Sequence, residues 1–398
     1  MLPAVCDDLG LPRSPFGGWL IGLSNQLKKE SNIELHIVTV DAKFSPFTKN
    51  IDGVFYHLVD NSLEQWQQLQ NKVKPNVVHI HGTEFNYGLN YIETNGSENV
   101  VFSIQGLVSV CYRYYNQGLE FLEILKNITF RDLIKRDSLF QSKHKFKKRG
   151  LIEREYFKKS RYVIGRTDWD HAHSLAINPQ INYFYGGEIL RPKFYESEKW
   201  NYNNCIPYTI FLSQAGYPIK GLHQVLKTLP LLISKYPHIK LKIGGNNILM
   251  NTTMKDKLRK NGYASIINHI IKVNGLVEHV EFLGPLSEDQ MIEQYLQSNV
   301  FVCPSSIENS PNSLAEAQML GVPNISSFVG GTLNMVKHGK NGFLYRFEEI
   351  EMLAYYIDEI FQQKEKASYL DEEILERHHP LTIKNQFIEI YNTIMKNS

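Results

Sequence analysis

The sequence contains few cysteines, and they form no pattern. Four are present in 398 residues (Cys6, Cys111, Cys205 and Cys303), and no two of them make a CxxC pair. A disulfide framework and a cysteine-based zinc site are therefore excluded. Scattered single cysteines are typical of reduced thiols, which predicts a cytoplasmic protein.

The sequence also lacks long apolar runs and a large excess of charge. No run of 18 apolar residues is present, and no signal-peptide pattern opens the chain, so we expect a protein that works inside the cell. The formal net charge is +2, which argues against a nucleic-acid partner. An aromatic content of 12% fits either a carbohydrate-handling surface or an ordinary core.

The length and the order of the apolar runs predict two α/β domains. A chain of 398 residues is too long for one ordinary core. Short β-rich runs alternate with helical segments, which is typical of parallel sheets with crossover helices. The expected strands are 34–40, 54–58, 77–82, 100–104 and 162–165, then 208–212, 239–243, 280–283, 300–302 and 323–325.

The two halves are separated by a segment without periodicity. Residues 186–207 are rich in Pro, Asn and charge and read as an interdomain linker. We therefore predict two Rossmann-like, doubly wound domains facing a cleft. The expected domains are 1–195 and 196–378, followed by a terminal helix over 379–398.

The start of the chain has a glycine-rich turn without a clear strand before it. Gly17 and Gly18 precede a helical segment at 19–29, where a doubly wound domain would place a strand before the turn. We predict that this first strand is missing, the alternative being a long irregular loop. The glycine pair is either an anion or sugar contact or simply a tight turn.

One stretch in the second half combines a strand, a polar loop and a helix. The apolar run 300–302 leads into a loop that contains Glu308, and a helix over 314–320 follows with Glu316 in it. A helix N-terminus suits a phosphate, and a carboxylate beside it can hold sugar or ribose hydroxyls. Ser310-Pro311 is an alternative helix start, with Pro at the first helical position. Glu316 also has a structural interpretation, because Ser313 and Glu316 have the spacing of a capping box. Glu308 has no such alternative.

A second loop in this half carries a lysine. Lys220 lies between the strand 208–212 and a helix at 222–235, where parallel strands present their ligand loops. A lysine there can stabilise the charge that grows on a diphosphate leaving group. Its other interpretation is a surface lysine. Gly244, at the end of the next strand, either lines a base pocket or makes a turn.

Two short motifs in the first half could each bind a metal ion. His79 and His81 share one face of a strand, so they form either a metal pair or a cleft-facing histidine with a packed neighbour. Asp168 and Asp170 follow another strand, but Thr167 and Asp170 also have the spacing of a capping box. We favour the capping box and the non-metal interpretation of the histidines.

Residues 108–160 form a mostly helical insertion. Nine Lys and Arg residues lie between Lys143 and Arg161, interspersed with aromatic and aliphatic residues. The segment 140–161 is therefore either a solvated helix or a peripheral contact with an anionic membrane surface.

The motifs of the second half resemble those of family 4 glycosyltransferases, which have the GT-B fold. Glu308 and Glu316 stand in its Glu-x7-Glu signature, with Pro304-Ser305 before it and Gly321-x-Pro323 after it. Gly17-Gly18, Lys220-Gly221 and Phe282-Leu283-Gly284 also match. The resemblance implies two Rossmann-like domains, a last helix that crosses back to the first domain, and retention of anomeric configuration. It also implies a nucleotide-sugar donor and no metal or other cofactor.

The resemblance also assigns roles by position. Glu308 would contact the donor sugar, Glu316 the ribose and Lys220 the diphosphate, with Gln105 completing the catalytic set. The expected donor-binding positions are Gly17, Gly18, Gln214, Lys220, Gly244, Asn309, Asn312, Ser313, Leu314 and Glu316. On the acceptor side we expect His81 and Arg166.

Two positions depart from the family pattern. Gln214 stands where the family usually has an arginine, and Gln105 where it often has a histidine. Glutamine can hydrogen-bond to a sugar but cannot shuttle a proton at neutral pH. Arg166 could supply some of the missing positive charge.

The leading hypothesis is a retaining hexosyltransferase that needs no metal. It would move a sugar to a glycan or lipid-linked glycan, as in bacterial surface-polysaccharide synthesis, in the cytoplasm or on the cytoplasmic membrane face. The alternatives are a degenerate nucleotide-sugar-binding protein without turnover and a metal hydrolase that uses His79 and His81.

Overall fold

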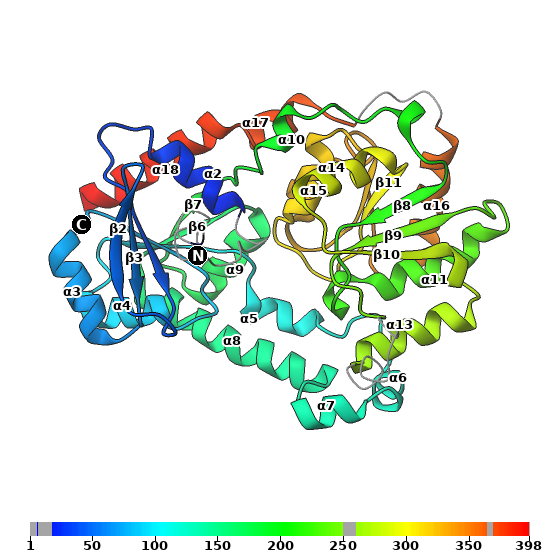
Figure 1. Ribbon diagram of the computed structural model, residues 1–398, viewed down its shortest axis with the longest axis horizontal. Helices are drawn as coiled ribbons and strands as arrows, with labels where there is room; N and C mark the ends of the chain where they lie inside the picture. The colour runs from blue at the N-terminus through cyan, green and yellow to red at the C-terminus, as the bar shows by residue number, and fades with distance from the viewer. Residues whose placement is uncertain (1–5, 7–17, 250–259, 364–368, 398) are drawn as a thin grey trace. The chain divides into compact units, whose positions relative to one another are not determined.

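The structure is a computed structural model that describes residues 6, 18–249, 260–363 and 369–397. It contains two compact units (Figure 1). Unit 1 comprises residues 1–107, 149–192 and 376–398, and unit 2 comprises residues 108–148 and 193–375.

Unit 1 contains a four-stranded parallel sheet. Its strand order is β4 (Val78–His81), β5 (Val100–Ser103), β6 (Tyr162–Gly165), β7 (Asn182–Tyr185). Every residue of β5 and β6 is buried, as expected for parallel strands covered on both faces. All four carboxyl ends therefore lie at one edge of the sheet.

A second sheet of unit 1 has three strands. β1 (His36–Val40) pairs in parallel with β3 (Val54–Val59), and β3 pairs antiparallel with β2 (Phe47–Ile51). Asp52 and Gly53, both with positive φ, form the two-residue turn of the β2–β3 hairpin. Within the described segments, no pairing joins this sheet to β4. The prediction of a missing first strand concerns residues 1–5 and 7–17, which lie outside the described segments.

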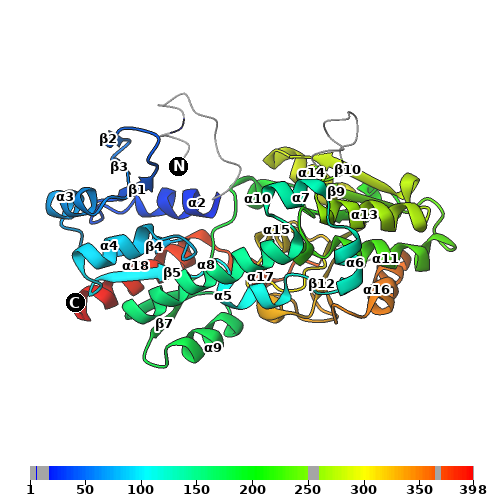
Figure 2. The same cartoon turned by 90° about the horizontal axis from the view of Figure 1, so that it is seen from below.

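The helices of unit 1 follow the predicted alternation. They are α2 (Gly18–Leu27), α3 (Leu63–Val73), α4 (Tyr87–Asn95), α9 (Asp168–Ile177), α18 (Pro380–Asn397) and the second half of α8 (Leu139–Lys159). The terminal helix α18 lies beside α2 (Figures 1 and 2), and Lys384 Nζ is 2.6 Å from Glu30 Oε1 across the pair. The C-terminal helix therefore belongs to unit 1, as the resemblance implies.

Unit 2 contains a six-stranded, fully parallel sheet. Its strand order is β10 (Val280–Gly284), β9 (Lys240–Gly244), β8 (Thr209–Leu212), β11 (Val300–Cys303), β12 (Asn324–Ser327), β13 (Phe343–Tyr345). Along the chain, the strands move outward from β8 to β10 and then return to the other side of β8. This reversal places a topological switch point between β8 and β11, where open α/β sheets bind ligands.

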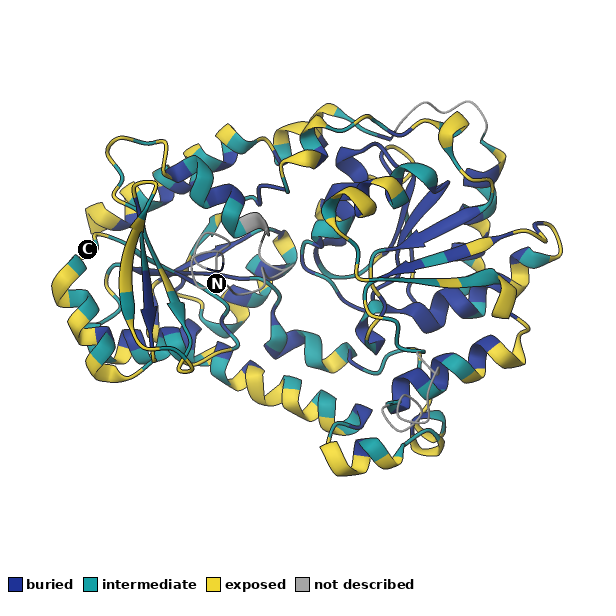
Figure 3. Ribbon diagram, in the orientation of Figure 1, coloured by how far each residue is buried: buried dark blue, intermediate teal, exposed yellow. Residues whose placement is uncertain are grey.

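Helices cover this sheet, and the buried residues concentrate in its strands (Figure 3). The main ones are α11 (Leu222–Ile233), α13 (Gly262–Val273), α14 (Glu288–Gln297), α15 (Asn312–Met319) and α16 (Ile350–Gln362); α10 (Lys193–Glu196) and α17 (Glu372–Arg377) are short. The parallel sheets of both units confirm the predicted α/β class.

The insertion 108–148 packs with unit 2, whereas the predicted domain 1–195 placed it in the first half. It contains α5 (Val108–Cys111), the 3₁₀ turn Tyr112–Tyr114, α6 (Phe121–Lys126), α7 (Phe130–Lys135) and the first half of α8. His223 bonds to Gln117 O at 3.0 Å, and Lys227 Nζ donates to Gly118 O at 3.0 Å. These contacts join segments about a hundred positions apart, so local sequence patterns do not reveal them.

Candidate functional site

Two loops meet at the switch point of the unit 2 sheet. One follows β8 and ends in the turn Tyr217–Gly221; the other follows β11 and covers Pro304–Glu308. Ser306 N donates to Ile219 O at 2.8 Å, which joins the two loops directly. The residues predicted to contact the diphosphate and the donor sugar, Lys220 and Glu308, are therefore neighbours.

Lys220 and Glu308 form an ion pair. Their Nζ and Oε1 atoms are 2.5 Å apart, and the two side chains are only 15% and 14% exposed. Ser305 Oγ donates to the same Glu308 oxygen at 2.8 Å. Tyr217 lies beneath the lysine, with Nζ 5.9 Å from its ring centroid. The charged pair was predicted from the sequence, whereas the contacts of Ser305 and Tyr217 with it were not.

The electrostatics of the pair keep the lysine charged. Burial by itself lowers the pKa of Lys220, but the carboxylate of Glu308 and the oxygen of Tyr217 outweigh it, so the pKa is raised. Burial raises the pKa of the neighbouring Cys303 thiol to about 12, and Glu308 adds to this shift. At neutral pH the site thus holds a charged lysine, paired with Glu308, beside a neutral thiol.

Two glycines hold the backbone around this pair. Gly221 has φ +70°, and a Cβ there would overlap the carbonyl of Pro304. Gly330 has φ +52°, and a Cβ there would overlap the carbonyl of Glu308, which also accepts a hydrogen bond from Gly331 N at 3.0 Å. Only glycine allows these close approaches at positive φ.

The second signature carboxylate lies in α15. The helix begins at Asn312 with Pro311 as its N-cap, and no side chain caps it. The capping box proposed for Ser313 and Glu316 is therefore wrong, because the helix starts earlier than the spacing suggested. Glu316 is 7% exposed and loses its structural explanation as a capping residue.

The remaining donor-side residues are distributed around these loops. Gly244 ends β9 and approaches the carbonyl of Ser213, whereas Gln214 is exposed in the same loop. Asn309 is 3% exposed, and Asn312 is the first residue of α15. The amides of Ser313 and Leu314 were expected to face a phosphate.

The first turn of α15 already uses one of those amides. Leu314 N donates to Pro311 O at 3.0 Å, so this amide is engaged within the helix start. Tyr295 OH donates to the carbonyl of Ser313 at 2.8 Å, which ties the same turn to α14.

A pocket in unit 1 contains Gln105, which was predicted to be catalytic, and the two residues predicted for the acceptor side. Its polar lining includes His81, Gln105 and Arg166, which follow or end β4, β5 and β6. They meet because the carboxyl ends of parallel neighbours share one edge. The full lining is Leu23, His81, Ser103, Gln105, Ile164, Arg166, Gly186, Gly187, Glu188, Ile189, Ile383 and Phe387.

Arg166 is the most heavily bonded residue of this pocket. Its guanidinium pairs with Glu188 at 2.6 Å, and both side chains are 8% exposed. It also donates to Ile104 O at 2.5 Å and to Gln105 Oε1 at 3.3 Å. The charge of Arg166 is thus neutralised locally, and its donors hold the end of β5 in place. Glu188 was not among the residues predicted from the sequence.

The two histidines of β4 serve different purposes. His79 bonds to Tyr391 OH at 2.8 Å through Nδ1 and to Ser103 Oγ at 2.6 Å through Nε2, so both ring nitrogens are engaged. Burial lowers the pKa of His81 to about 3, and Arg166 adds to the shift. Within the described segments, no group of three or more His, Cys, Asp or Glu residues could hold a metal ion.

The aspartates after β6 form a helix cap. Thr167 Oγ1 accepts from Asp170 N at 3.2 Å, and the Asp170 side chain accepts from the backbone of Thr167 and Arg166. The capping-box prediction is confirmed. Of the predicted glycine pair, Gly18 begins α2, whereas Gly17 lies outside the described segments.

The basic helix α8 shields most of its apolar residues from solvent: Leu139, Tyr156 and Phe157 are buried, and Phe140, Phe146 and Ile152 are half-buried. Tyr156 and Phe157 are fully buried against Phe102, and Phe146 packs on Tyr115 with ring centroids 4.9 Å apart. Leu151 alone among its large apolar side chains is exposed, at 59%. No helix within the described segments combines the length and hydropathy that crossing a bilayer requires.

Comparison with protein families gives a match over most of unit 2. Residues 196–377 match the family Glycosyl transferases group 1. This range contains Lys220, Glu308 and Glu316. Both signature glutamates and the charged pair therefore lie inside the range that matches this family.

Curated relatives match the chain at low identity. The uncharacterized glycosyltransferase YqgM of Bacillus subtilis is 24% identical over 53% of this chain and 56% of its own length. The capsular polysaccharide biosynthesis glycosyltransferase CapM of Staphylococcus aureus is 24% identical over 45% of this chain and 44% of its own. The chain spans about half the length of these relatives.

Solved structures resemble nearly the whole chain. A sucrose-phosphate synthase from Thermosynechococcus elongatus covers 96% of this chain and 94% of its own, with a TM-score of 0.67 and 15% identity. Anabaena Alr3699/HepE in complex with UDP covers 96% and 97%, with a TM-score of 0.63 and 14% identity. At this identity the likeness shows the fold, and it confirms the predicted GT-B class.

Proposed function

From the glycosyl transferases group 1 domain at residues 196–377, we propose that this protein transfers a sugar from a nucleotide-sugar donor to a glycan or lipid-linked glycan. The observation that carries the proposal is the Lys220–Glu308 pair at the switch point of unit 2. A lysine and a carboxylate side by side suit the two ends of such a donor, since the diphosphate is anionic and the sugar is rich in hydroxyl groups.

The charged pair gives each side chain a role in the proposed reaction. Without donor, Lys220 is neutralised by Glu308. A donor diphosphate would take over the lysine, and the carboxylate would then accept hydrogen bonds from the sugar hydroxyls. Negative charge grows on the diphosphate as the glycosidic bond breaks, so a preorganised ammonium group stabilises the transition state more than the ground state.

The finer features of the proposal come from the family 4 resemblance. We propose retention of anomeric configuration, hexose transfer, no metal requirement and a site on the cytoplasmic face of a membrane. The HepE complex with UDP supports a nucleoside diphosphate as the leaving group, and CapM supports a polysaccharide context. The Gln105–Arg166 pocket is the proposed acceptor side.

The test measures nucleoside diphosphate release from a panel of nucleotide sugars, with and without EDTA. Turnover that resists EDTA and is lost in Lys220→Ala and Glu308→Ala supports the proposal. The matched control is Lys337→Ala, because Lys337 and Glu373 form an exposed lysine–glutamate pair in the same unit. NMR of the product's anomeric proton reports retention or inversion.

Each contrary result has a distinct meaning. Donor binding without release would favour the degenerate binding protein, for which Gln105 and Gln214 are the motivation. Activity abolished by EDTA would overturn metal independence. Full activity in both Lys220→Ala and Glu308→Ala would overturn the assignment of the site.

A further inference from the structure

Two short helices of unit 2 expose large apolar side chains. Between residues 121 and 134, the outward side chains have exposed fractions of 42% to 71%. They are Phe121, Leu122 and Leu125 of α6, and Phe130, Leu133 and Ile134 of α7; we call these six residues the α6–α7 patch. Figure 3 shows exposed segments on these helices. Exposed apolar residues gathered this closely typically mark an interaction site.

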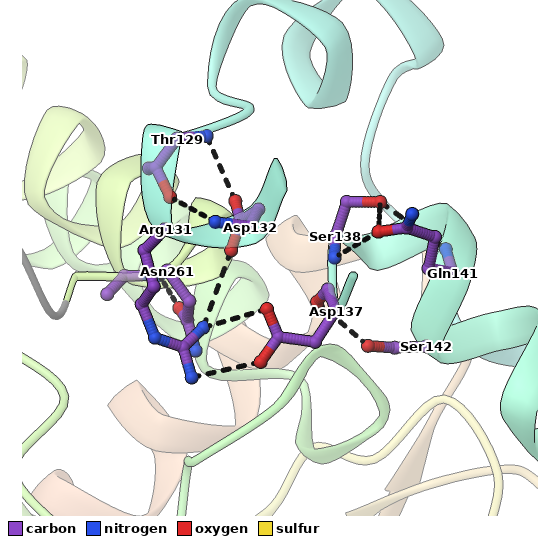
Figure 4. Close-up of polar contacts among 9 residues, drawn as sticks. Thr129, Arg131, Asp132, Asp137, Ser138, Gln141, Ser142 and Asn261 are labelled. Carbon is purple, nitrogen blue, oxygen red and sulfur yellow. Dashed lines mark hydrogen bonds and ion pairs between the residues drawn. The ribbon is translucent and has the colours of Figure 1, made fainter. Parts of the chain in front are cut away.

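The α6–α7 segment is anchored through its polar residues. Asp132 is fully buried, and it exchanges capping-box hydrogen bonds with Thr129 (Figure 4). Arg131 bonds to Asp137 through two nitrogens, each at 2.9 Å, and lies 3.5 Å from Asp132. The buried network therefore holds α7 in one orientation, with its apolar residues outward.

Close packing against α13 reinforces this anchoring. A Cβ at Gly262, the first residue of α13, would lie 3.0 Å from both Asn127 O and Asp132 Oδ2. Asn261 caps α13 at the same place, accepting from Ala264 N at 2.8 Å. Ile124, the inward residue of α6, is 4% exposed. The helix α7 thus buries the polar Asp132 and exposes its apolar residues, the reverse of an ordinary surface helix.

The charge around the patch is positive. Residues 120–148 contain eight Lys and Arg residues against four Asp and Glu residues. Two of the four acids, Asp132 and Asp137, are already paired with Arg131. The exposed basic residues are Lys126, Lys135, Arg136, Lys145, Lys147 and Lys148. The partner of this surface should therefore be both apolar and anionic.

We propose that the α6–α7 patch docks onto an anionic lipid surface, with its apolar side chains in the interface and the surrounding lysines and arginines on the headgroups. Shallow insertion of apolar side chains and attraction of basic residues to anionic lipid add up in such binding. This inference deepens the proposed function, since it identifies how an enzyme acting on a lipid-linked acceptor would reach the membrane. It also moves the contact from the predicted segment 140–161, whose large apolar side chains apart from Leu151 are buried or half-buried, to residues 121–134.

The insertion 108–148, which contains the α6–α7 patch, also contacts the loop Pro304–Glu308. Ser306 Oγ, two residues before Glu308, donates to Tyr114 O at 2.9 Å. Gly118, with φ +79°, lies against His223 at the start of α11. A short connection therefore links the proposed lipid contact to the proposed donor loop within unit 2.

The experiment is co-sedimentation of the full chain with phosphatidylcholine vesicles that contain either no or 40% phosphatidylglycerol. We expect binding to the anionic vesicles and little to the neutral ones. Leu133→Asp should lower the partition coefficient on the order of tenfold, because it removes an apolar anchor and adds a negative charge. The matched control is Leu63→Asp in α3, whose leucine is also exposed, at 51%.

A second measurement shows whether the side chains of the patch enter the lipid. Phe130→Trp should add fluorescence that brominated phosphatidylglycerol quenches. Equal binding of Leu133→Asp and wild type, or of neutral and anionic vesicles, would overturn the proposal. A third result would also overturn it: no vesicle binding, together with a dimer in sedimentation velocity that Leu133→Asp converts to a monomer. The patch would then be a contact between two copies of the chain. Nucleoside diphosphate release without vesicles reports separately on the proposed function.

Discussion

In each unit a closely packed ion pair lies at the carboxyl edge of a parallel sheet, and the two pairs are built differently. Lys220 and Glu308 in unit 2 are 2.5 Å apart, and Arg166 and Glu188 in unit 1 are 2.6 Å apart. The lysine has one carboxylate and a tyrosine ring beside it. The arginine also donates to Ile104 and Gln105, so it ties together several segments.

This difference indicates that the Lys220–Glu308 pair can open to bind a ligand, whereas the Arg166–Glu188 pair is structural. A lysine is a compact charge on a flexible stem and can change partner without disturbing the backbone, whereas a multiply bonded arginine cannot. We therefore expect a donor to open the Lys220–Glu308 pair and the Arg166–Glu188 pair to stay closed. Arg166 would then serve the proposed acceptor side mainly by positioning Gln105.

The largest expected effect is on stability, in Arg166→Ala. Removing the guanidinium takes from the buried Glu188 carboxylate its partner at 2.6 Å, which should cost about 3–5 kcal/mol in the free energy of unfolding. Urea denaturation monitored by circular dichroism measures it. The double variant Arg166→Ala/Glu188→Ala should recover part of the loss. If Arg166→Ala unfolds like the wild type but has lost activity, the structural interpretation of this pair is wrong.

The next effect is on activity, in Lys220→Met. Loss of one preorganised charge at a developing oxyanion typically lowers kcat by about 10²–10³. The free energy of unfolding should change much less than in Arg166→Ala, because Glu308 keeps its bond from Ser305 and is 14% exposed. Steady-state release of nucleoside diphosphate and urea denaturation of the same preparation provide the two measurements. A large stability loss with unchanged kcat would reverse the comparison.

Much of the site in unit 2 could be predicted from residue patterns, because the signals lie within short stretches of sequence. The strands at 208–212 and 300–302 were recognisable as apolar runs, and Lys220 and Glu308 follow them directly. Their proximity follows from parallel pairing of β8 with β11. The Thr167–Asp170 cap was also predictable, since its signal lies within four residues.

Other features depend on contacts between distant segments. The insertion 108–148 follows β5 in the chain but packs with unit 2 through Gln117, Gly118 and Tyr114. Glu188 lies in the stretch interpreted as a linker, and nothing in that stretch indicates its partner Arg166. For α15, Pro311 and Ser313 both signal a helix start, and local sequence could not decide between them.

A smaller effect is expected from the glycine that joins the two loops of unit 2. Gly221→Ala places a Cβ against the Pro304 carbonyl at positive φ, which should cost about 1–3 kcal/mol. The two loops should separate, so we expect a higher KM for the donor in addition to a lower unfolding midpoint. Gly216→Ala is the control, because a Cβ there meets nothing within 4 Å. Equal behaviour of the two variants would show that the loop contact does not matter.

The smallest effect concerns pH and the pocket of unit 1. Burial, and secondarily Arg166, lower the pKa of His81 to about 3 in the folded protein, whereas the unfolded chain has the ordinary value of 6.5. Below pH 6.5 the unfolded state therefore binds a proton that the folded state does not, so stability falls as the pH falls toward 3. The contribution of one such histidine is about 1.4 kcal/mol per pH unit in that range.

Comparing the wild type with His81→Gln separates this contribution from those of His57, His223 and His378, whose pKa values are also lowered. The difference includes the effect of His81 on His79, whose pKa is lowered by burial and secondarily by His81. Free energies of unfolding at pH 7.5, 6 and 5 should show a shallower decline in the variant, by about 2 kcal/mol over the whole interval. Arg166→Ala should give an intermediate slope, since it removes only the secondary cause of the shift. Parallel pH profiles for all three proteins would mean that His81 is protonated in the folded state, and the pocket beside Arg166 would then be open to water and not closed around a structural ion pair.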